Sequence, residues 1–393
     1  MSKVPRLPAT HLLRTVFPYL RLLPVLALLL SVVSSLVSSP SSALPVDGLY
    51  SFELTVQNQS DAERRRAYRE ALAGVMLKVT GETRWLQQPQ LQSALNNAQS
   101  FVEEVSFRSG VQPRLVDTEP DADVLAEQQI ESVQAIFINV RFSRAAIDDL
   151  LDSANIPIWD RNRPSVLVWL SIQNASGERM LLGSDSEHQV MEIIRDFSQR
   201  RGIPLLIPVL DFTDRRNLSA DQAWSLEQQA IMEASERYGA DSVLSGRLLV
   251  TPTGDLVGLW QFMFDDSTST FDGFDSDLKS YMETSLDQVT TRLAARFSIV
   301  RNTLQGNDFV ILRVDGIKDI ASHQSVVSYV RDLAVVKNVA VSRLNGHTLE
   351  LKIALSGSRR HLAEFINLDR DLEAVNIAAG DDNIEFLHYR WTR

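Results

Sequence analysis

In the middle of the chain, apolar runs typical of strands alternate with segments whose apolar residues recur at helical spacing. The predicted fold is built around this part. Three apolar runs have the length and β-branched content of buried strands, and the two segments between them carry apolar residues at helical spacing. The predicted elements are, in order, the strand Arg163–Ile172, the helix Glu187–Arg201, the strand Ile203–Leu210, the helix Asp221–Tyr238 and the strand Ser242–Val250. Helical crossovers join parallel strands, so the pattern predicts a central α/β sheet with parallel βα units.

The same domain continues beyond these elements. Residues Leu256–Phe264 alternate with both sets of positions largely apolar, which predicts a strand covered on both faces. A helix over Ser276–Phe297 completes the unit. We therefore predict a central α/β domain at residues 162–303.

The segment before it, residues 44–161, predicts an α+β domain with the order β-α-α-β-β-α. Ser60 or Asp61 can cap a helix that Gly81 ends. Ser109–Gln129 is polar and acidic, which predicts a loop, and Val133–Phe142 alternates as a strand.

The last segment, residues 304–393, has the order β-α-β-β-α-β, which is that of a ferredoxin-like domain. Asn345-Gly346 between two alternating runs is a strong hairpin signal, and Ile384–Tyr389 is the predicted final strand. The fold class is thus α/β and α+β in three domains.

Residues 1–43 predict an export signal. Their only charges are positive, Leu22–Val33 is apolar, and small residues precede a cleavage point before Leu44. We therefore expect a periplasmic protein with no stable membrane span after cleavage. The alternative is an uncleaved helix at residues 17–37 that anchors the protein in the inner membrane, which Pro18 and Pro24 disfavour.

Composition excludes several classes of function. Cleavage removes four of the 39 basic residues and none of the 50 acidic ones, which takes the net charge from −11 to −15. Such an acidic protein repels phosphate backbones, so we expect no nucleic-acid partner. The chain has no Cys, which excludes disulfides, thiolate metal sites and a Cys nucleophile.

The sequence contains no recognisable catalytic constellation. It has no Gly-x-Ser-x-Gly elbow and no Gly-rich phosphate loop, and its six His lack metal-ligand spacing. His188 and His361 lie near helix starts, where surface or capping roles are expected. We therefore predict no catalytic residue, no cofactor and no dedicated metal site.

The acidic stretch Asp265–Asp277 is the strongest candidate for a binding site. Asp272, Asp275 and Asp277 are weak candidates for ligands of a divalent cation. Because the glycine does not fit an EF-hand, a hairpin tip and a helix start explain these acids better. Phe271 and Phe274 lie in the same polar stretch and are candidates for a partner contact.

Several stretches together resemble one family. They are Asp47–Tyr50, Asn58–Arg64, Ala71-Leu72, Lys78–Gly81 and, most distinctively, Pro157–Trp159 followed by Arg163–Leu170. The chain is similar to uncharacterised proteobacterial envelope proteins catalogued as domain of unknown function 2066. The resemblance covers nearly all of the chain after the signal. It implies export and brings no catalytic residues.

A shorter likeness concerns Tyr238–Leu248. This stretch is similar to a helix-to-strand junction in envelope scaffold and activator domains, namely the amino-terminal domain of the Tol translocation protein, the curli secretion subunit and the activators of penicillin-binding proteins. Those domains are interaction domains rather than enzymes, and the likeness speaks to the fold more than to the role.

Three functional hypotheses follow. The favoured one is an exported, non-enzymatic accessory or scaffold that contacts other envelope proteins. The alternatives are an envelope hydrolase with a dispersed active site and a module that binds a divalent cation or small ligand. The partner, the substrate and the oligomeric state are left open.

Overall fold

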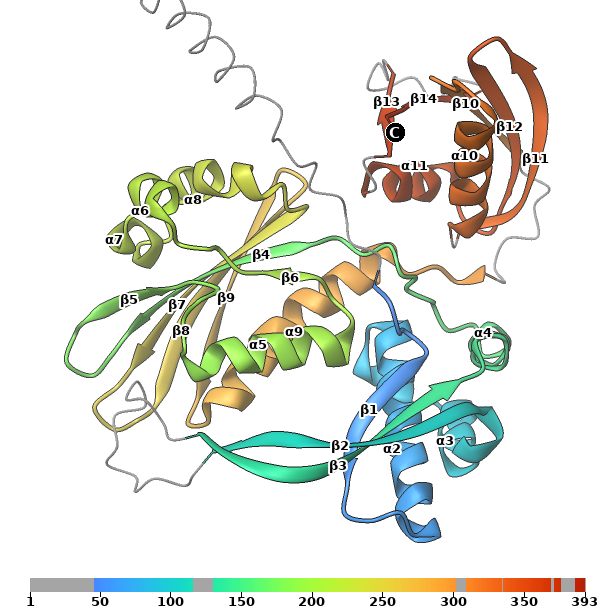
Figure 1. The fold of residues 1–393 in the computed structure, drawn as a ribbon. Coiled ribbons are helices and arrows are strands. Elements are labelled where there is room, and N and C mark those ends of the chain that lie inside the picture. The colour runs from blue at the N-terminus through green and yellow to red at the C-terminus, as the bar shows by residue number, and fades with distance from the viewer. Residues whose placement is uncertain are drawn as a thin grey trace, which may run out of the picture. The chain divides into compact units, whose positions relative to one another are not determined.

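The computed structural model describes residues 46–115, 130–301, 309–333, 335–368, 371–375 and 386–392. The predicted signal at 1–43 and the alternative anchor at 17–37 lie outside the described residues. Within them, no helix has both the length and the apolar character needed to cross a membrane. The described residues form a mixed α+β structure with three sheets, which confirms the predicted fold class (Figure 1).

The first sheet comes from the N-terminal segment. It contains β1 (Ser51–Val56), β2 (Val102–Leu115) and β3 (Ile130–Phe142) in the antiparallel order β1-β3-β2, with helices α2 (Asp61–Thr80), α3 (Pro89–Asn96) and α4 (Arg144–Ser153). The predicted order β-α-α-β-β-α is confirmed. The Ser60 hydroxyl caps α2 by accepting from the Glu63 N–H, and Gly81 ends the helix at a φ of 75°.

One part of the predicted loop at Ser109–Gln129 is wrong. Residues 109–115 continue β2, which pairs with β3 as far as Leu115 opposite Ile130. The hydrogen bonds between paired strands join backbone groups, so a strand can contain polar residues whose side-chain pattern does not predict it. Residues 116–129 lie outside the described residues.

The second sheet comes from the central segment. Its strands are β4 (Val166–Gln173), β5 (Arg179–Leu182), β6 (Leu205–Leu206), β7 (Ser242–Val250), β8 (Leu256–Phe264) and β9 (Ser267–Asp275). The order is β5-β4-β7-β8-β9, with β6 beside β4. The predicted parallel pairing is confirmed for β4, which runs parallel to β6 and β7. The other pairs are antiparallel.

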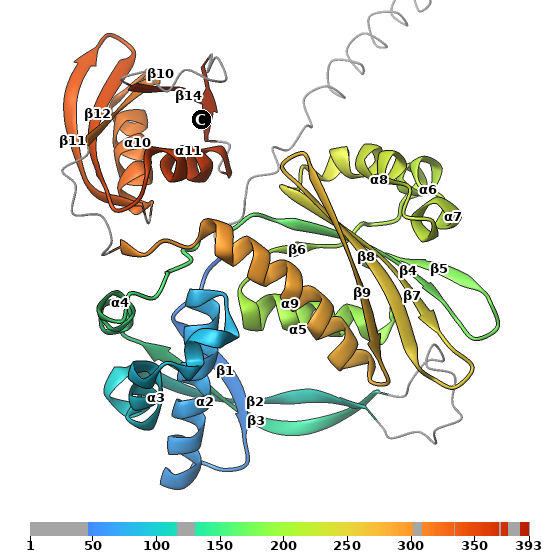
Figure 2. The same ribbon diagram turned by 180° about the vertical axis from the view of Figure 1, so that it is seen from behind.

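Helices cover both faces of the second sheet. One face packs on α5 (Gln189–Arg201) and α9 (Leu278–Phe297). The other packs on α7 (Ala220–Trp224) and α8 (Gln228–Ser235), and α6 (Phe212–Asn217) contacts α8. Figure 2 shows α9 along the end of the sheet formed by β8 and β9.

Two predicted central elements are shorter than expected. The predicted strand Ile203–Leu210 reduces to β6, and Leu210 has a φ of +55°. The predicted helix Asp221–Tyr238 is broken into α7, α8 and a 3-10 turn, with Leu226 between them at a φ of +54°. Both helical pieces pack on the same face of the sheet, so apolar spacing continued across the break and did not reveal it.

The third sheet comes from the C-terminal segment. Its elements are β10 (Phe309–Asp315), α10 (Ile320–Asp332), β11 (Val336–Asn345), β12 (Thr348–Leu355), α11 (Arg359–Leu368), β13 (Leu372–Ala374) and β14 (Phe386–Trp391). The hairpin at Asn345-Gly346 is confirmed, with Gly346 at a φ of 59°. Residues 384–385 of the predicted last strand lie outside the described residues.

The third sheet departs from the simple ferredoxin-like pattern at its end. The strand order is β11-β12-β10-β14-β13, so a fifth strand is present. The chain after α11 first forms the edge strand β13, and β14 then lies between β13 and β10. The chain reverses direction between β13 and β14, which are antiparallel, and as a result β14 runs parallel to β10. The domain boundaries near residues 161 and 303 stay predictions, since residues 42–393 group as one unit.

A buried arginine joins the N-terminal helix α2 to the central helix α5. Arg163 is fully buried and stacks over the Trp159 ring at 4.2 Å. Its guanidinium donates only to main-chain carbonyls, those of Lys78 (2.6 Å), Trp159 (2.8 Å), Asp160 (2.9 Å), Gly202 (2.9 Å) and Arg201 (3.0 Å). The carbonyl ends of two helices carry partial negative charge, which stabilises this cation.

Candidate functional site

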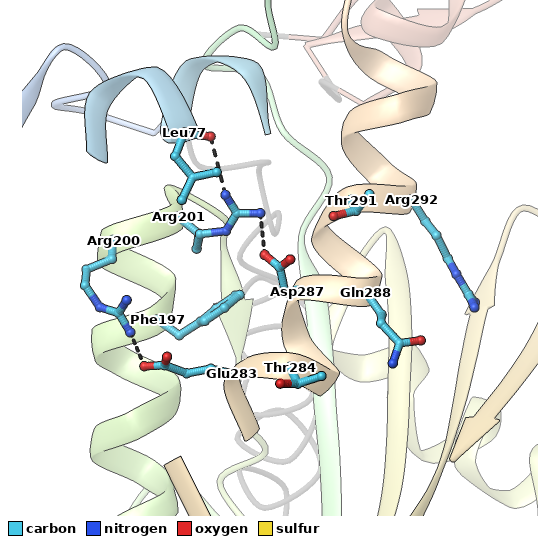
Figure 3. A pocket seen from close by; sticks show the side chains of 10 residues that line it. All are labelled: Leu77, Phe197, Arg200, Arg201, Glu283, Thr284, Asp287, Gln288, Thr291 and Arg292. Carbon is cyan, nitrogen blue, oxygen red and sulfur yellow. Dashed lines mark hydrogen bonds and ion pairs between the residues drawn. The ribbon is translucent and has the colours of Figure 1, made fainter. Parts of the chain in front are cut away.

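A pocket opens where α2, α5 and α9 meet (Figure 3). It has a volume of about 570 Å³. Helix α9 supplies most of the wall, α5 supplies three residues and α2 supplies one. The lining residues are Leu77, Phe197, Arg200, Arg201, Glu283, Thr284, Asp287, Gln288, Thr291 and Arg292.

Arginines of α5 hold the two acids of the pocket. Arg201 is 3% exposed and its Nη2 lies 2.5 Å from the Asp287 carboxylate. The same guanidinium donates to the carbonyls of Leu77 (3.4 Å) and Gly81 (3.0 Å) at the end of α2. Burial lowers the pKa of Arg201, and Asp287 opposes that effect. The pair therefore fastens three helices together.

The neighbouring pair repeats this arrangement closer to solvent. Arg200 donates from Nε to Asp196 at 2.8 Å and from Nη2 to Glu283. Figure 3 shows both arginines reaching from α5 to carboxylates on α9. Each acid of the pocket is therefore already engaged by an arginine.

The pocket offers donors rather than a catalytic pair. Its ten lining residues include no His or Cys, and no hydrogen bond joins Thr284 or Thr291 to a side chain of the described residues that could act as a base. Nucleophilic catalysis by a hydroxyl requires a base within hydrogen-bond reach. The observed geometry of the lining does not supply that pair.

A larger groove of about 1340 Å³ runs between β1 and α5. Lys78 in this groove is 8% exposed, and its ammonium donates to the carbonyls of Gly48 (3.3 Å) and Ser51 (3.0 Å). Burial, with a contribution from Arg163, lowers the pKa of Lys78 to about 8. Further along the strand, Arg66 donates to the Thr55 carbonyl at 3.3 Å. Cations therefore occupy the open edge of β1 at two points.

The acidic stretch Asp265–Asp277 forms a hairpin turn, the strand β9 and the residues that lead into α9. Residues 267–275 form β9, and Asp265 and Asp266 make the two-residue turn before it with φ values of 50° and 56°. Asp272 and Asp275 stand at positions of opposite parity on the strand, so their side chains project from opposite faces. Asp272 is exposed.

Asp277 caps the start of α9, and Asp275 holds the turn just before it. The Asp275 carboxylate accepts from the Ser280 hydroxyl (2.6 Å) and from the N–H groups of Ser276 and Asp277. The Ser280 hydrogen bond is the main cause that lowers the pKa of Asp275. Asp277 accepts from the Ser280 N–H at 2.7 Å. Across the described ranges, no group of three or more His, Asp or Glu side chains is placed to hold a metal ion.

The two candidate contact residues have different environments. Phe271 stacks on Trp260 with ring centroids 6.4 Å apart and packs against the core. Phe274 is 72% exposed and lies opposite Val257, which is 41% exposed. Alternation along β9 separates the two rings, so only Phe274 is available to a partner.

Sequence reasoning missed a more exposed aromatic residue. Phe212 at the start of α6 is 80% exposed, and Val209 just before it is 49% exposed. Residues 211–219 are mostly polar, a composition typical of a loop, but Asp211 caps α6 by accepting from the N–H groups of Thr213 and Asp214. The Asp211-x-x-Asp214 spacing around an aromatic residue was the signal in the sequence that could have revealed the start of α6 and the exposed ring.

A hydrogen-bond network around the buried Asp214 side chain anchors this exposed segment. The Tyr238 hydroxyl accepts from the Val209 N–H (2.8 Å) and donates to Asp214 (2.5 Å), whose side chain is fully buried. Arg237 donates to Asp214 at 2.9 Å and to both oxygens of Asp211. Burial, and then the Asp214 hydrogen bond, raise the pKa of Tyr238 to about 12.

The expected capping histidines are confirmed. The His188 Nδ1 accepts from the Val190 N–H at 3.2 Å and caps α5. Burial lowers the pKa of His188. The His361 Nδ1 accepts from the Ser358 N–H near the start of α11.

Comparison with known proteins assigns part of the chain. Residues 43–160 match a family model described as "Domain of unknown function (DUF8605)". No curated protein and no solved structure matches the chain. An uncharacterised domain is therefore supported for the N-terminal segment, which contains the first sheet and helices α2 to α4.

Proposed function

We propose that the protein is a non-enzymatic accessory or scaffold of the cell envelope that acts through protein contacts. The observation that carries this proposal is the exposure of Phe212 beside a hydrogen-bonded network. An aromatic side chain that is 80% exposed stands on backbone fixed by the buried Asp214 network. Aromatic anchors dominate binding energies, and a pre-organised anchor loses little conformational entropy when a partner covers it.

The sequence supports the compartment in this proposal. The pattern of residues 1–43 is that of an export signal, which leads to the periplasm when cleaved. The resemblance to the proteobacterial envelope proteins of domain of unknown function 2066 supports the same location. The likeness of Tyr238–Leu248 to envelope scaffold and activator domains supports contacts as the mode of action.

The two alternative functions find less support in the geometry. A hydrolase needs a free acid or a nucleophile with its base, whereas arginines hold both acids of the α2–α5–α9 pocket. A cation module would need Asp272, Asp275 and Asp277 to converge, whereas Asp277 caps α9 and the Asp275 carboxylate accepts hydrogen bonds from the turn before it.

Affinity capture from envelope extract tests the proposal. Phe212→Ser should reduce recovery of the enriched partner by roughly tenfold or more, because a central aromatic anchor contributes at least that much. The control is Ile320→Ser, which changes an apolar side chain that is 84% exposed on a different sheet domain. Equal recovery with wild type and Phe212→Ser, or turnover of a cell-wall substrate without any enriched partner, would refute the proposal.

A further inference from the structure

The outermost strand of the central sheet, β9, has an open edge. Strand β8 is its only partner in the described sheet. The two-residue turn makes Phe264 and Ser267 the first hydrogen-bonded pair of the hairpin. Starting at Ser267, every second residue of β9 therefore directs its backbone N–H and C=O groups toward β8. The residues between them direct their N–H and C=O groups away from the sheet. They are Thr268, Thr270, Asp272 and Phe274, and all four are exposed.

This edge lacks the protection found elsewhere in the molecule. No described residue hydrogen-bonds the eight outward backbone groups of β9. On β1, by contrast, Lys78 and Arg66 occupy edge carbonyls. Proteins usually block edge strands with charges, proline or a covering element, because an open edge is a template for another strand.

The two faces beside the open edge differ in character. On the face turned away from α9, the exposed side chains include the apolar pair Phe274 and Val257. On the face that packs on α9, Arg292 of that helix lies 5.2 Å from the Phe271 ring centroid and donates to the Ser269 hydroxyl. Arg292 is exposed, and no carboxylate of the described residues lies within 4.0 Å of its guanidinium.

We propose that β9 accepts an extended segment of a partner protein as an added strand. The segment carries apolar side chains on the face of Phe274 and acidic side chains on the face of Arg292. Main-chain hydrogen bonds to the edge supply affinity, and the alternating side chains supply specificity. This inference rests on the proposed function and names the kind of partner segment that the scaffold holds.

Synthetic peptides test the charge pattern. The probe is a blocked peptide of nine residues, the length of β9, with alternating Val and Glu. The comparison peptide has Lys in place of Glu. The full protein has a net charge of −11, so non-specific attraction favours the Lys peptide. Local recognition by Arg292 instead predicts about tenfold tighter binding of the Glu peptide, measured by fluorescence anisotropy at about 0.15 M salt.

Two substitutions at one position test the strand pairing. Thr270→Pro removes an edge N–H without disturbing the ladder to β8, and proline is tolerated on edge strands. It should weaken binding of the Glu peptide about tenfold, because a donor is lost and the ring blocks the ladder. Thr270→Val keeps the N–H and should bind like wild type. Arg292→Gln should remove the preference for Glu over Lys.

Each outcome decides the inference. Equal binding by Thr270→Pro and Thr270→Val, tighter binding of the Lys peptide, or no binding of either peptide overturns strand addition at β9. The proposed function is judged separately by Phe212→Ser in the capture experiment. Loss of capture there, combined with any of the three results above, overturns the strand-addition mode and leaves the scaffold function standing.

Discussion

Lys78 should make the stability of the protein depend on pH in an unusual window. The residue is 8% exposed, and its ammonium lies 5.3 Å from the Phe52 ring centroid with no carboxylate among the described residues within 4.0 Å. Burial lowers its pKa from 10.5 to about 8. The unfolded chain therefore keeps the proton between pH 8 and 10.5, where the folded protein has released it.

The sign and size of the effect follow from this difference. The unfolded state binds more protons in the window, so the free energy of unfolding rises with pH. Below pH 8 both states carry the charge, and the folded protein bears the cost of burying it. Integration of the two titration curves from about pH 7.5 to about pH 9.5 predicts a gain of about 2 kcal/mol from this one side chain.

Urea unfolding of wild type and Lys78→Met at both pH values measures the effect. The wild type should gain about 2 kcal/mol more than Lys78→Met over this interval, because methionine fills the space without a titrating group. Lys279→Met is the control, since Lys279 also lines the groove but has an exposed side chain. Tyrosines contribute an opposite effect only at higher pH. Burial raises the pKa of Tyr281 and Tyr389 to about 12, so they lower the free energy of unfolding only where the unfolded tyrosines ionise, near pH 10. Equal pH slopes in wild type and Lys78→Met would refute the reasoning.

Three further predictions concern other buried groups. Arg163→Met should lower the free energy of unfolding by about 3–5 kcal/mol in urea, because helix-end carbonyls lose a buried cation; an unchanged midpoint would refute this. Gly81→Ala should lower the free energy of unfolding by about 2–4 kcal/mol, because an added Cβ would lie 2.2 Å from the Cβ of Ala294. Gly254→Ala is the control: it has open space around it and should lower that free energy by only about 1 kcal/mol. Burial lowers the pKa of His188, so the unfolded chain takes up this proton first as pH falls below 6.5 and the melting temperature should drop. His188→Asn, which keeps a cap, should flatten this dependence between about pH 7 and pH 5; an unchanged slope would contradict it.

Helix ends and tight turns were predictable from sequence because short-range chemistry determines them. Ser60 and Gly81 bound α2, and Asn345-Gly346 forms its hairpin, as predicted. In each case the decisive hydrogen bond or backbone angle involves residues a few positions apart. The same local chemistry explains Asp277 as the cap of α9 and Asp275 as an acceptor in the turn before it.

The candidate site was less predictable because it depends on residues far apart in the chain. Arg201 meets Asp287 and the end of α2 only when three helices pack. Phe271 and Phe274 both stand in a polar stretch, and only the pairing of β9 with β8 sends one ring to the core and the other to solvent. A polar edge strand carries little apolar periodicity, so the sequence pattern resembles that of a loop.

By itself, then, the amino-acid sequence determined the mixed α and β class, the order of most elements, their caps and the parallel pairing of the central strands. Tertiary structure alone decided the open edge of β9, the exposure of Phe212, the edge strand β13 and the parallel orientation of β14 beside β10. The physical reason is the range of the interactions. Capping and apolar periodicity act within a few residues, whereas strand pairing and buried ion pairs join backbone and charge across distant parts of the chain.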